Sequence, residues 1–256
     1  MASSQTDLPL HRFRSDDGLD LVYREIGEGR PLVLIHGLFS NGWVNWVRYG
    51  HAKLIADAGF RVIMPDLRGH GESAAPHDPS FYPPDVLAQD GAALVRHLHL
   101  TDYDLGGYSL GGRTTLRMLV RGATPRRAIL SGMGLEGMLH TSGRSGFFRQ
   151  VLEGMGTHAR GSGAWMAEAF LKTTGGDPFA MLPLLGSFVD TTREEIAAIA
   201  TPTLVLAGID DHDNGSSADL AALLPTAHLA HIPGNHMTSV LRPELGDEIR
   251  AFLLAR

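Results

Sequence analysis

One serine of the chain lies among four glycines, in the segment 106–112 with the sequence GGYSLGG. A short apolar run that predicts a strand precedes Ser109, and a helical pattern follows it. The central five residues fit the pattern G-x-S-x-G, which in this context holds a serine at a sharp strand-to-helix turn and exposes its hydroxyl as a nucleophile. A phosphate-binding loop is excluded because no Lys-Ser or Lys-Thr pair follows the glycines. A plain packing turn is the alternative on this segment alone.

A serine nucleophile needs a base, and the base needs a carboxylate that orients it. His236 comes just past the predicted strand at 227–234, and Asp211 lies three residues beyond the end of the predicted strand at 201–208. Ser109, Asp211 and His236 therefore follow three different strands, in the order serine, acid, histidine. These three residues form the predicted catalytic triad.

Two backbone N–H groups are candidates for stabilising the oxyanion of such a reaction. Leu110 is the first residue of the helix after the serine, where N–H groups and the positive end of the helix dipole meet a developing negative charge. Leu38 lies in the segment His-Gly-Leu-Phe at 36–39, just after the predicted strand at 31–37. The N–H groups of Leu38 and Leu110 are the predicted oxyanion hole.

The elements that must position these residues are strands and helices in alternation. We expect strands at 19–27, 31–37, 60–66, 103–109, 126–132, 201–208 and 227–234, and helices at 45–59, 83–100, 110–122, 217–225 and 242–256. The first strand partly alternates apolar and polar residues, as an exposed edge strand does, while the others are short apolar runs typical of strands buried on both faces. The pattern predicts an α/β fold with a doubly wound, mostly parallel sheet.

The alternation stops between residues 133 and 200. This stretch is rich in Gly, Met and Phe and has poor periodicity, so the predicted core comprises 1–132 and 201–256, with 133–200 as an insertion over one edge of the sheet. An insertion of this size has more large apolar side chains than it can bury within itself, and some of them are expected to line a permissive apolar pocket. The predicted pocket residues are Phe39, Trp43, Tyr108, Met133, Trp165 and Met237. For Trp43 and the apolar residues of the insertion, ordinary packing is the alternative.

Composition excludes several classes of function. The net charge of −6 gives no electrostatic footprint for nucleic acid or an anionic membrane. The absence of cysteine excludes thiolate catalysis and cysteine-ligated metals. We see no signal peptide and no apolar run that approaches the roughly 20 residues of a membrane span. We expect a cytoplasmic protein that uses no metal and no cofactor, and whose partner is a small molecule.

The chain resembles the α/β-hydrolase superfamily, in the branch of serine esterases and lactonases with a helical lid. The resemblance rests on the His-Gly loop at 36–37, the turn PDLRGHGES at 65–73 and the Gly-x-Ser-x-Gly-Gly elbow, and it covers nearly the whole chain outside 133–200. It implies that 133–200 is the lid. It also implies that Asp211 has the usual spacing of the acid, although the proline that often follows the acid is missing here, which leaves Asp210 and Asp213 as alternatives. Tyr108 stands where many relatives have a histidine.

The expected function is the hydrolysis of a small to medium apolar carboxylic ester or lactone through an acyl-enzyme. The resemblance also implies two alternatives with the same triad, the hydrolysis of a carbon–carbon bond and cofactor-free perhydrolysis. A third alternative belongs to another class, a slow-turnover receptor for a small molecule. Epoxide hydrolases and dehalogenases of this fold are excluded because they use a carboxylate where this chain has Ser109.

Overall fold

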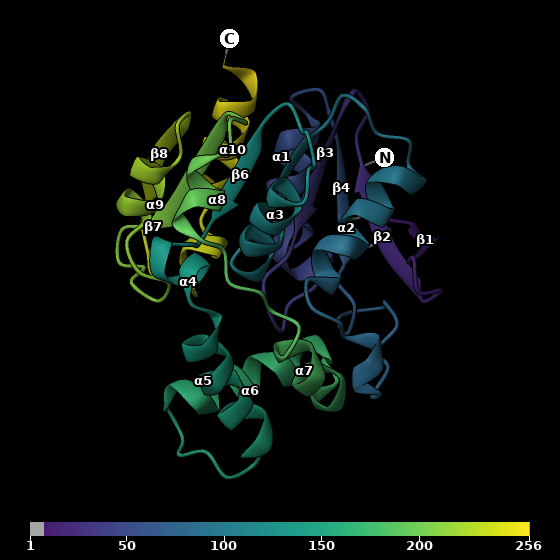
Figure 1. The fold of residues 1–256 in the computed structure, drawn as a ribbon, viewed down its shortest axis with the longest axis vertical. Coiled ribbons are helices and arrows are strands. Elements are labelled where there is room, and N and C mark those ends of the chain that lie inside the picture. Colours follow the sequence, from purple (N-terminus) through teal and green to yellow (C-terminus); the bar gives the residue numbers. More distant parts are fainter. Residues whose placement is uncertain (1–7, 256) are drawn as a thin grey trace.

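The computed structural model describes residues 8–255, which form one sheet with helices on both faces and a helical layer at one end (Figure 1). The sheet order is β1-β2-β4-β3-β5-β6-β7-β8. Within these residues, only β2 runs against the other strands. The strands are β1 (Leu10–Arg14), β2 (Asp20–Ile26), β3 (Arg30–Ile35), β4 (Phe60–Asp66), β5 (Asp104–Tyr108), β6 (Ala128–Ser131), β7 (Thr203–Gly208) and β8 (Ala227–Ile232). The prediction of a mostly parallel, doubly wound sheet is confirmed.

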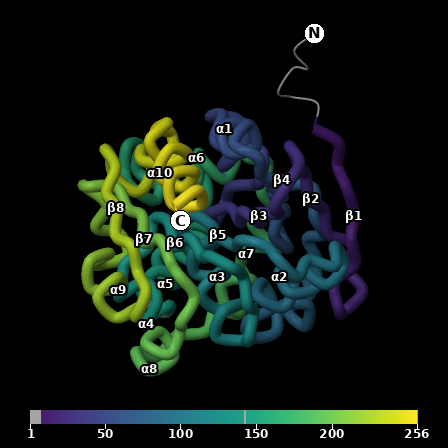
Figure 2. The backbone as a smooth tube through the Cα atoms, turned by 90° about the horizontal axis from the view of Figure 1, so that it is seen from above, coloured from purple at the N-terminus to yellow at the C-terminus, as the bar shows by residue number. Residues whose placement is uncertain are grey.

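The helices cover the two faces of the sheet unequally. In the view along the sheet, α1 and α10 lie on one side, and α2, α3, α8 and α9 lie on the other (Figure 2). The helices are α1 (His51–Ala56), α2 (Val86–His97), α3 (Leu110–Val120), α4 (Leu135–Leu139), α5 (Thr141–Glu153), α6 (Gly163–Thr174), α7 (Pro178–Leu185), α8 (Arg193–Ala197), α9 (Ser217–Leu223) and α10 (Pro243–Leu254). No helix within residues 8–255 combines the length and the apolar character needed to cross a bilayer.

The central strands pack on both faces because their side chains alternate in direction. On β3, Leu32 and Leu34 belong to the apolar cluster under α1 and α10, whereas Val33 and Ile35 belong to the cluster under α2 and α3. All four side chains are fully buried. A continuous apolar run therefore marks a strand between two helical layers.

Two predicted elements differ from the structure. The predicted strand at 19–27 is not the edge of the sheet, because β1 pairs with it in antiparallel register and occupies the edge instead. The predicted helix at 45–59 is divided into a π-helical segment, Trp43–Val47, and α1. The division falls at Gly50, whose φ of 85° is incompatible with an α-helix.

The predicted insertion at 133–200 consists of two kinds of structure. Helices α5, α6 and α7 lie together beyond the end of the sheet where Ser109 is found (Figure 1). In contrast, Leu135 and Met138 of α4 and Ile196 of α8 are buried in an apolar cluster with β7 and α9. The segment that lies apart from the sheet is therefore narrower than 133–200.

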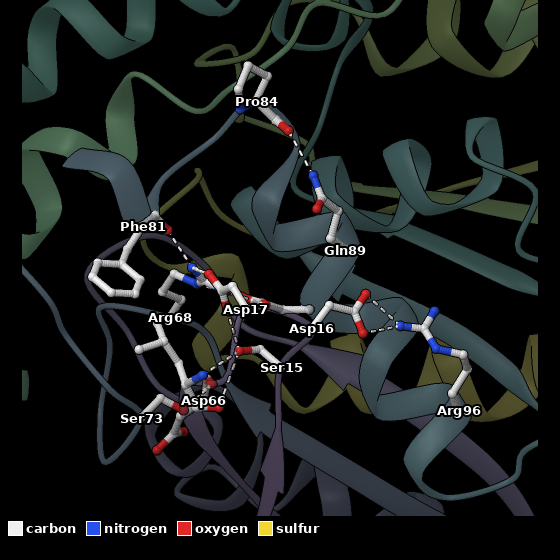
Figure 3. Close-up of polar contacts among 12 residues, drawn as sticks. Ser15, Asp16, Asp17, Asp66, Arg68, Ser73, Phe81, Pro84, Gln89 and Arg96 are labelled. Carbon is white, nitrogen blue, oxygen red and sulfur yellow. Dashed lines mark hydrogen bonds and ion pairs between the residues drawn. The ribbon is translucent and has the colours of Figure 1, made fainter. Parts of the chain in front are cut away.

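The turn after β4 is held by a polar network that includes Asp66, Arg68 and Ser73. The Ser73 hydroxyl donates to the carbonyl of Asp66 at 2.6 Å. Figure 3 shows the buried Arg68 guanidinium between Asp17 and the carbonyl of Phe81. This network fixes the loop that lies next to the His-Gly segment at 36–37.

Candidate active site

Ser109 lies in a strained turn between the end of β5 and the start of α3. Its φ of 54° and ψ of −116° lie in a region that residues other than glycine rarely adopt. The turn is tight: a Cβ on Gly111 would lie only 2.1 Å from the carbonyl oxygen of Ile35, at the end of β3, which shows how closely α3 approaches that strand. Glycine at this position lets α3 approach β3 and holds the serine in the strained conformation.

The structure brings the three predicted triad residues together. His236 Nε2 is 3.0 Å from Ser109 Oγ, and His236 Nδ1 is 2.9 Å from Asp211 Oδ2. The side chains of His236 and Asp211 are 9% and 3% exposed. An acceptor at Nδ1 favours the tautomer with the proton on Nδ1, which leaves Nε2 free to accept the proton of Ser109.

The loop after β7 distinguishes the three candidate acids. Asp211 is the carboxylate that meets His236. Asp213 is exposed and forms an ion pair with Arg144 of α5 at 3.3 Å. The N–H of Asp213 donates to Asp211 Oδ1 at 3.2 Å, so this residue supports the acid without contacting the histidine. Asp210 is exposed as well.

Leu110 directly follows Ser109, and Gly37, the residue before Leu38, lies against it, since a Cβ on Gly37 would be 3.4 Å from Ser109 Cβ. Within residues 8–255, the N–H groups of Leu38 and Leu110 have no hydrogen-bond partner. The loop that carries Leu38 is fixed on both sides. Asn45 Oδ1 accepts the N–H of Gly37 at 3.1 Å, and His70 Nε2 accepts the N–H of Phe39 at 3.2 Å. Two donors beside a strained serine are an arrangement that can hold a tetrahedral oxyanion.

Two buried histidines tie this loop to the turn after β4. His36 donates from Nδ1 to the carbonyl of Gly37 at 2.8 Å and accepts the N–H of Leu67 at Nε2, at 2.9 Å. Burial lowers the pKa of His36 to about 4, and burial together with the neighbouring His36 lowers the pKa of His70 to about 3. Both rings are therefore neutral at pH 7 and act as structural links.

Two cavities meet at Ser109. The larger, of about 250 Å³, borders His236 and is mostly apolar. Its lining residues are Gly37, Leu38, Ser40, Val44, Asn45, Tyr49, Tyr108, Ser109, Phe170, His236, Met237, Val240 and Leu241. The smaller, of about 40 Å³, borders Leu110 and contains Met133, Arg113 and Arg144 in its wall. Ser109 and Leu38 belong to both cavities.

Three predicted pocket residues line these cavities and three do not. Tyr108 and Met237 line the larger cavity, and Met133 lines the smaller one. Phe39 is buried in the core, where it packs edge-on against Phe148. Trp43 packs in the cluster under α1 and α10. Trp165 lies on the first turn of α6, 38% exposed and outside both cavity walls.

The polar residues of the cavity walls that the sequence did not predict include Asn45 and Arg113. Asn45 is 4% exposed, and because Oδ1 holds the N–H of Gly37, its Nδ2 is a buried donor without a partner among residues 8–255. Arg113 lies one helical turn after Ser109, so the motif itself could have drawn attention to it. The structure also gives Tyr108 a role, since its hydroxyl donates to the carbonyl of His236 at 2.6 Å.

No group of three or more metal-ligating side chains occurs in the part of the chain that the structure describes. The exposed His212 and Asp213 lie beside the acid and form no such group.

Comparisons with known proteins place the fold among known ones. Residues 30–142 match the alpha/beta hydrolase fold family. The chain is 28% identical to a non-heme haloperoxidase of Rhodococcus erythropolis, over 86% of this chain and 90% of that protein. Among solved structures, it is similar to a thermophilic esterase from Thermogutta terrifontis (TM-score 0.77, 24% identity, 96% of this chain and 98% of the other) and to an esterase from Rhodococcus sp. ECU1013 (TM-score 0.70, 26% identity, 95% and 98%). These likenesses show that the chain has the alpha/beta hydrolase fold.

Proposed function

We propose that this protein is a serine hydrolase that cleaves a carboxylic ester or lactone through an acyl-enzyme. The observation that carries the proposal is the continuous line of hydrogen bonds from Ser109 through His236 to Asp211, beside two free backbone N–H groups. A nucleophile, a base, an orienting acid and an oxyanion hole are the parts that acyl transfer requires. The solved esterases with the same fold support the reaction class.

In the proposed mechanism, His236 Nε2 takes the proton of Ser109 as Oγ attacks the ester carbonyl. The N–H groups of Leu38 and Leu110 donate to the oxyanion, and Asp211 stabilises the imidazolium. Collapse of the intermediate breaks the bond to the leaving oxygen, which takes the proton from His236. Water then attacks the acyl-enzyme, again with His236 as base, and releases the acid and free Ser109.

We propose that α5, α6 and α7, from Thr141 to Leu185, act as the lid of this site. Three observations support this. Phe170 of α6 lines the larger cavity, and Phe148 of α5 lines the smaller one. The hydroxyl of Thr174 in α6 donates to the carbonyl of Phe39 in the oxyanion loop at 2.6 Å. The lid helices therefore contribute walls to both cavities and contact the loop that carries an oxyanion donor.

The test is the hydrolysis of p-nitrophenyl esters of increasing acyl length by the wild type and by Ser109→Ala. We expect turnover by the wild type and a loss of roughly 10⁴-fold or more in kcat for Ser109→Ala, since the nucleophile is removed. Ser131→Ala is the control, because Ser131 is a serine at the end of the neighbouring strand β6 that lies outside both cavity walls, and its hydroxyl has no partner among residues 8–255. Full activity in Ser109→Ala, with the fold intact by circular dichroism, would contradict the proposal.

Perhydrolysis is a second candidate, supported by the similarity to a non-heme haloperoxidase over 86% of this chain. In that reaction hydrogen peroxide replaces water in the second step. Its oxygen attacks the carbonyl of the acyl-enzyme, Ser109 is released, and the acyl group leaves as a peracid. The same ester assay with added hydrogen peroxide distinguishes the two. Peracid formation that exceeds hydrolysis, and that is lost in Ser109→Ala, would favour this candidate.

A further inference from the structure

The smaller cavity beside Ser109 has a cationic and polar wall. Arg113 of α3 and Arg144 and Ser145 of α5 line it, together with Leu110 and Ser109. At about 40 Å³ the cavity accommodates only a small group. Arg144 is paired with Asp213, so the positive charge of this wall comes mainly from Arg113.

Arg113 is a buried cation without a carboxylate partner. It is 8% exposed, and Nη1 and Nη2 donate to the carbonyls of Gly137 (2.6 Å) and Val189 (2.9 Å), which fix the guanidinium. Within residues 8–255, no carboxylate forms an ion pair with it at 4.0 Å or less. Burial lowers the pKa of Arg113 to about 10, while the more distant Asp190 and Asp85 oppose this decrease, so the group is still charged at pH 7.

Arg117, the next arginine of the same helix, has the carboxylate partner that Arg113 lacks. Arg117, one turn further along α3, is also buried, and its Nη2 lies 2.5 Å from Asp85 Oδ2. Buried charges in proteins are normally paired in this way, because an uncompensated charge in a low dielectric is costly. Arg117 is paired with Asp85, whereas Arg113 has no such pair and lines the smaller cavity. A ligand in that cavity can therefore supply the negative charge that pairs with Arg113.

The lid helix α5 adds two further donors to the same cavity. Arg144 lies 3.3 Å from Asp213, and its guanidinium is stacked over the ring of Phe148 at 5.3 Å. Ser145 Oγ is buried and has no partner within residues 8–255. Arg113, Arg144 and Ser145 thus line one small space, and guanidinium and hydroxyl groups are the donors that bind a carboxylate.

The position of His236 decides which part of the substrate enters this cavity. The leaving oxygen must receive its proton from His236 Nε2, and His236 lines the larger cavity. The alcohol part of an ester therefore occupies the larger, apolar cavity. The acyl part lies on the other side of Ser109, where the smaller cavity borders Leu110 and Arg113.

We propose that the smaller cavity is an anion subsite that binds a carboxylate at the end of a short acyl chain. The preferred substrate is then a half-ester of a short dicarboxylic acid with an apolar alcohol. This inference rests on the ester hydrolysis proposed above and defines the chemical class of its substrate.

The test compares two esters that differ only in charge, monobenzyl succinate and its neutral amide analogue, benzyl succinamate. Release of benzyl alcohol gives kcat/KM for each. We expect the wild type to prefer the half-ester by about tenfold or more, because a charge-assisted pair is lost with the amide. Arg113→Met is expected to abolish this preference, and Arg113→Lys to retain part of it.

Arg144→Gln tests the contribution of the lid, with Arg149→Gln as its matched control. Arg149 is on the same helix, half exposed, outside both cavity walls, and 3.7 Å from Glu153. We expect Arg144→Gln to reduce the ratio of the two kcat/KM values at least threefold, and Arg149→Gln to leave it unchanged. The amide ester reports any general loss of activity, since a folding defect lowers both values together.

A wild-type ratio near one, or an unchanged ratio in Arg113→Met, would overturn the anion subsite while leaving ester hydrolysis intact. A wild type that hydrolyses neither these esters nor the p-nitrophenyl esters contradicts the proposed function. Binding of succinate, measured by calorimetry, then tests the subsite without turnover. Binding that is lost in Arg113→Met supports it, and no binding to the wild type overturns it.

Discussion

The hydroxyl of Tyr108 connects the strand before the nucleophile to the loop of the base. It donates to the carbonyl of His236 at 2.6 Å and lies 2.8 Å from Ser239 Oγ. The ring also lies against the imidazole, with the two centroids 5.5 Å apart. The hydroxyl of Tyr108 therefore positions His236 through the backbone.

We predict that Tyr108→Phe lowers kcat about tenfold and the free energy of unfolding by about 1 kcal/mol, because one buried hydrogen bond is lost while the ring is kept. Steady-state kinetics and denaturant unfolding measure the two effects. Tyr82→Phe is the control, since Tyr82 is also buried and donates to a backbone carbonyl, that of Pro76, at 2.8 Å. Equal losses of kcat in both variants would show that the effect on activity is not specific to Tyr108.

Individual site residues could be predicted from the sequence where the residue type and its position after a strand identify the role. Ser109, Asp211 and His236 fit a pattern that depends on chain order and on strand ends, and the structure places their side chains within hydrogen-bond distance. Cavity walls were harder to predict, because they combine residues from segments far apart in the chain. Arg113, Arg144 and Phe188 meet in one wall only through the packing of α3, α5 and the segment after α7.

The sharp turn between β5 and α3 depends on the close approach of α3 to β3. A Cβ on Gly111 would meet the carbonyl oxygen of Ile35 at 2.1 Å and its carbon at 2.5 Å, and these backbone atoms cannot move without breaking the sheet. Gly146, inside α5, has nothing within 4 Å of the same position. The two helical glycines thus differ in the reason for their presence.

We predict opposite effects for alanine at these two glycines. Gly111→Ala should lower the free energy of unfolding by about 3 kcal/mol or more, because the added methyl group separates α3 from β3. Gly146→Ala should raise it by about 0.5–1 kcal/mol, because alanine favours a helix and meets no obstacle. Urea unfolding of both variants is the measurement. Destabilisation of similar size in both would contradict the close-approach argument.

Among the elements, the central strands and their helices were predictable because each strand is a continuous apolar run. The strand β1 was not predicted: its five residues, LHRFR, have only a weak alternation, and pairing with β2 stabilises them as a strand. The hydrophobic pattern also could not predict where the lid helices begin and end. Met138 and Ile196 are core residues of short helices, and only their burial beside β7 separates them from the lid helices.

For the molecule as a whole, stability and the active site share one pair of buried histidines. His36 and His70 stack edge-on with centroids 5.0 Å apart, and each accepts a backbone N–H at Nε2 and donates from Nδ1. A proton added to either ring replaces an acceptor with a donor that faces an N–H group. Protonation therefore destabilises the folded conformation of both the oxyanion loop and the turn after β4.

The pKa values give the pH range and the direction of this effect. Both histidines titrate near pH 6.5 when the chain is unfolded, whereas burial lowers the pKa of His36 to about 4 and that of His70 to about 3 in the fold. Between the folded and the unfolded pKa values, the unfolded chain binds more protons than the fold does. The contribution of the two neutral histidines to the free energy of unfolding is therefore fully present above pH 6.5 and is lost as the pH decreases. For His36 alone the loss by pH 4 is about 3 kcal/mol. Asp90, whose pKa burial raises to about 6, offsets part of this slope.

We predict that the free energy of unfolding decreases between pH 6.5 and 4, and that His36→Gln, measured by urea unfolding across this range, has a shallower slope. Glutamine can still accept a hydrogen bond but does not titrate, so this variant is less stable at pH 7 yet loses less on acidification. Comparison with the wild type removes the contribution of Asp90, because both proteins contain it. His99→Asn, at an exposed histidine with a φ of 52°, should keep the wild-type slope. A slope in His36→Gln as steep as in the wild type would show that other groups cause the acid sensitivity, and that His36 contributes to the fold only through its hydrogen bonds.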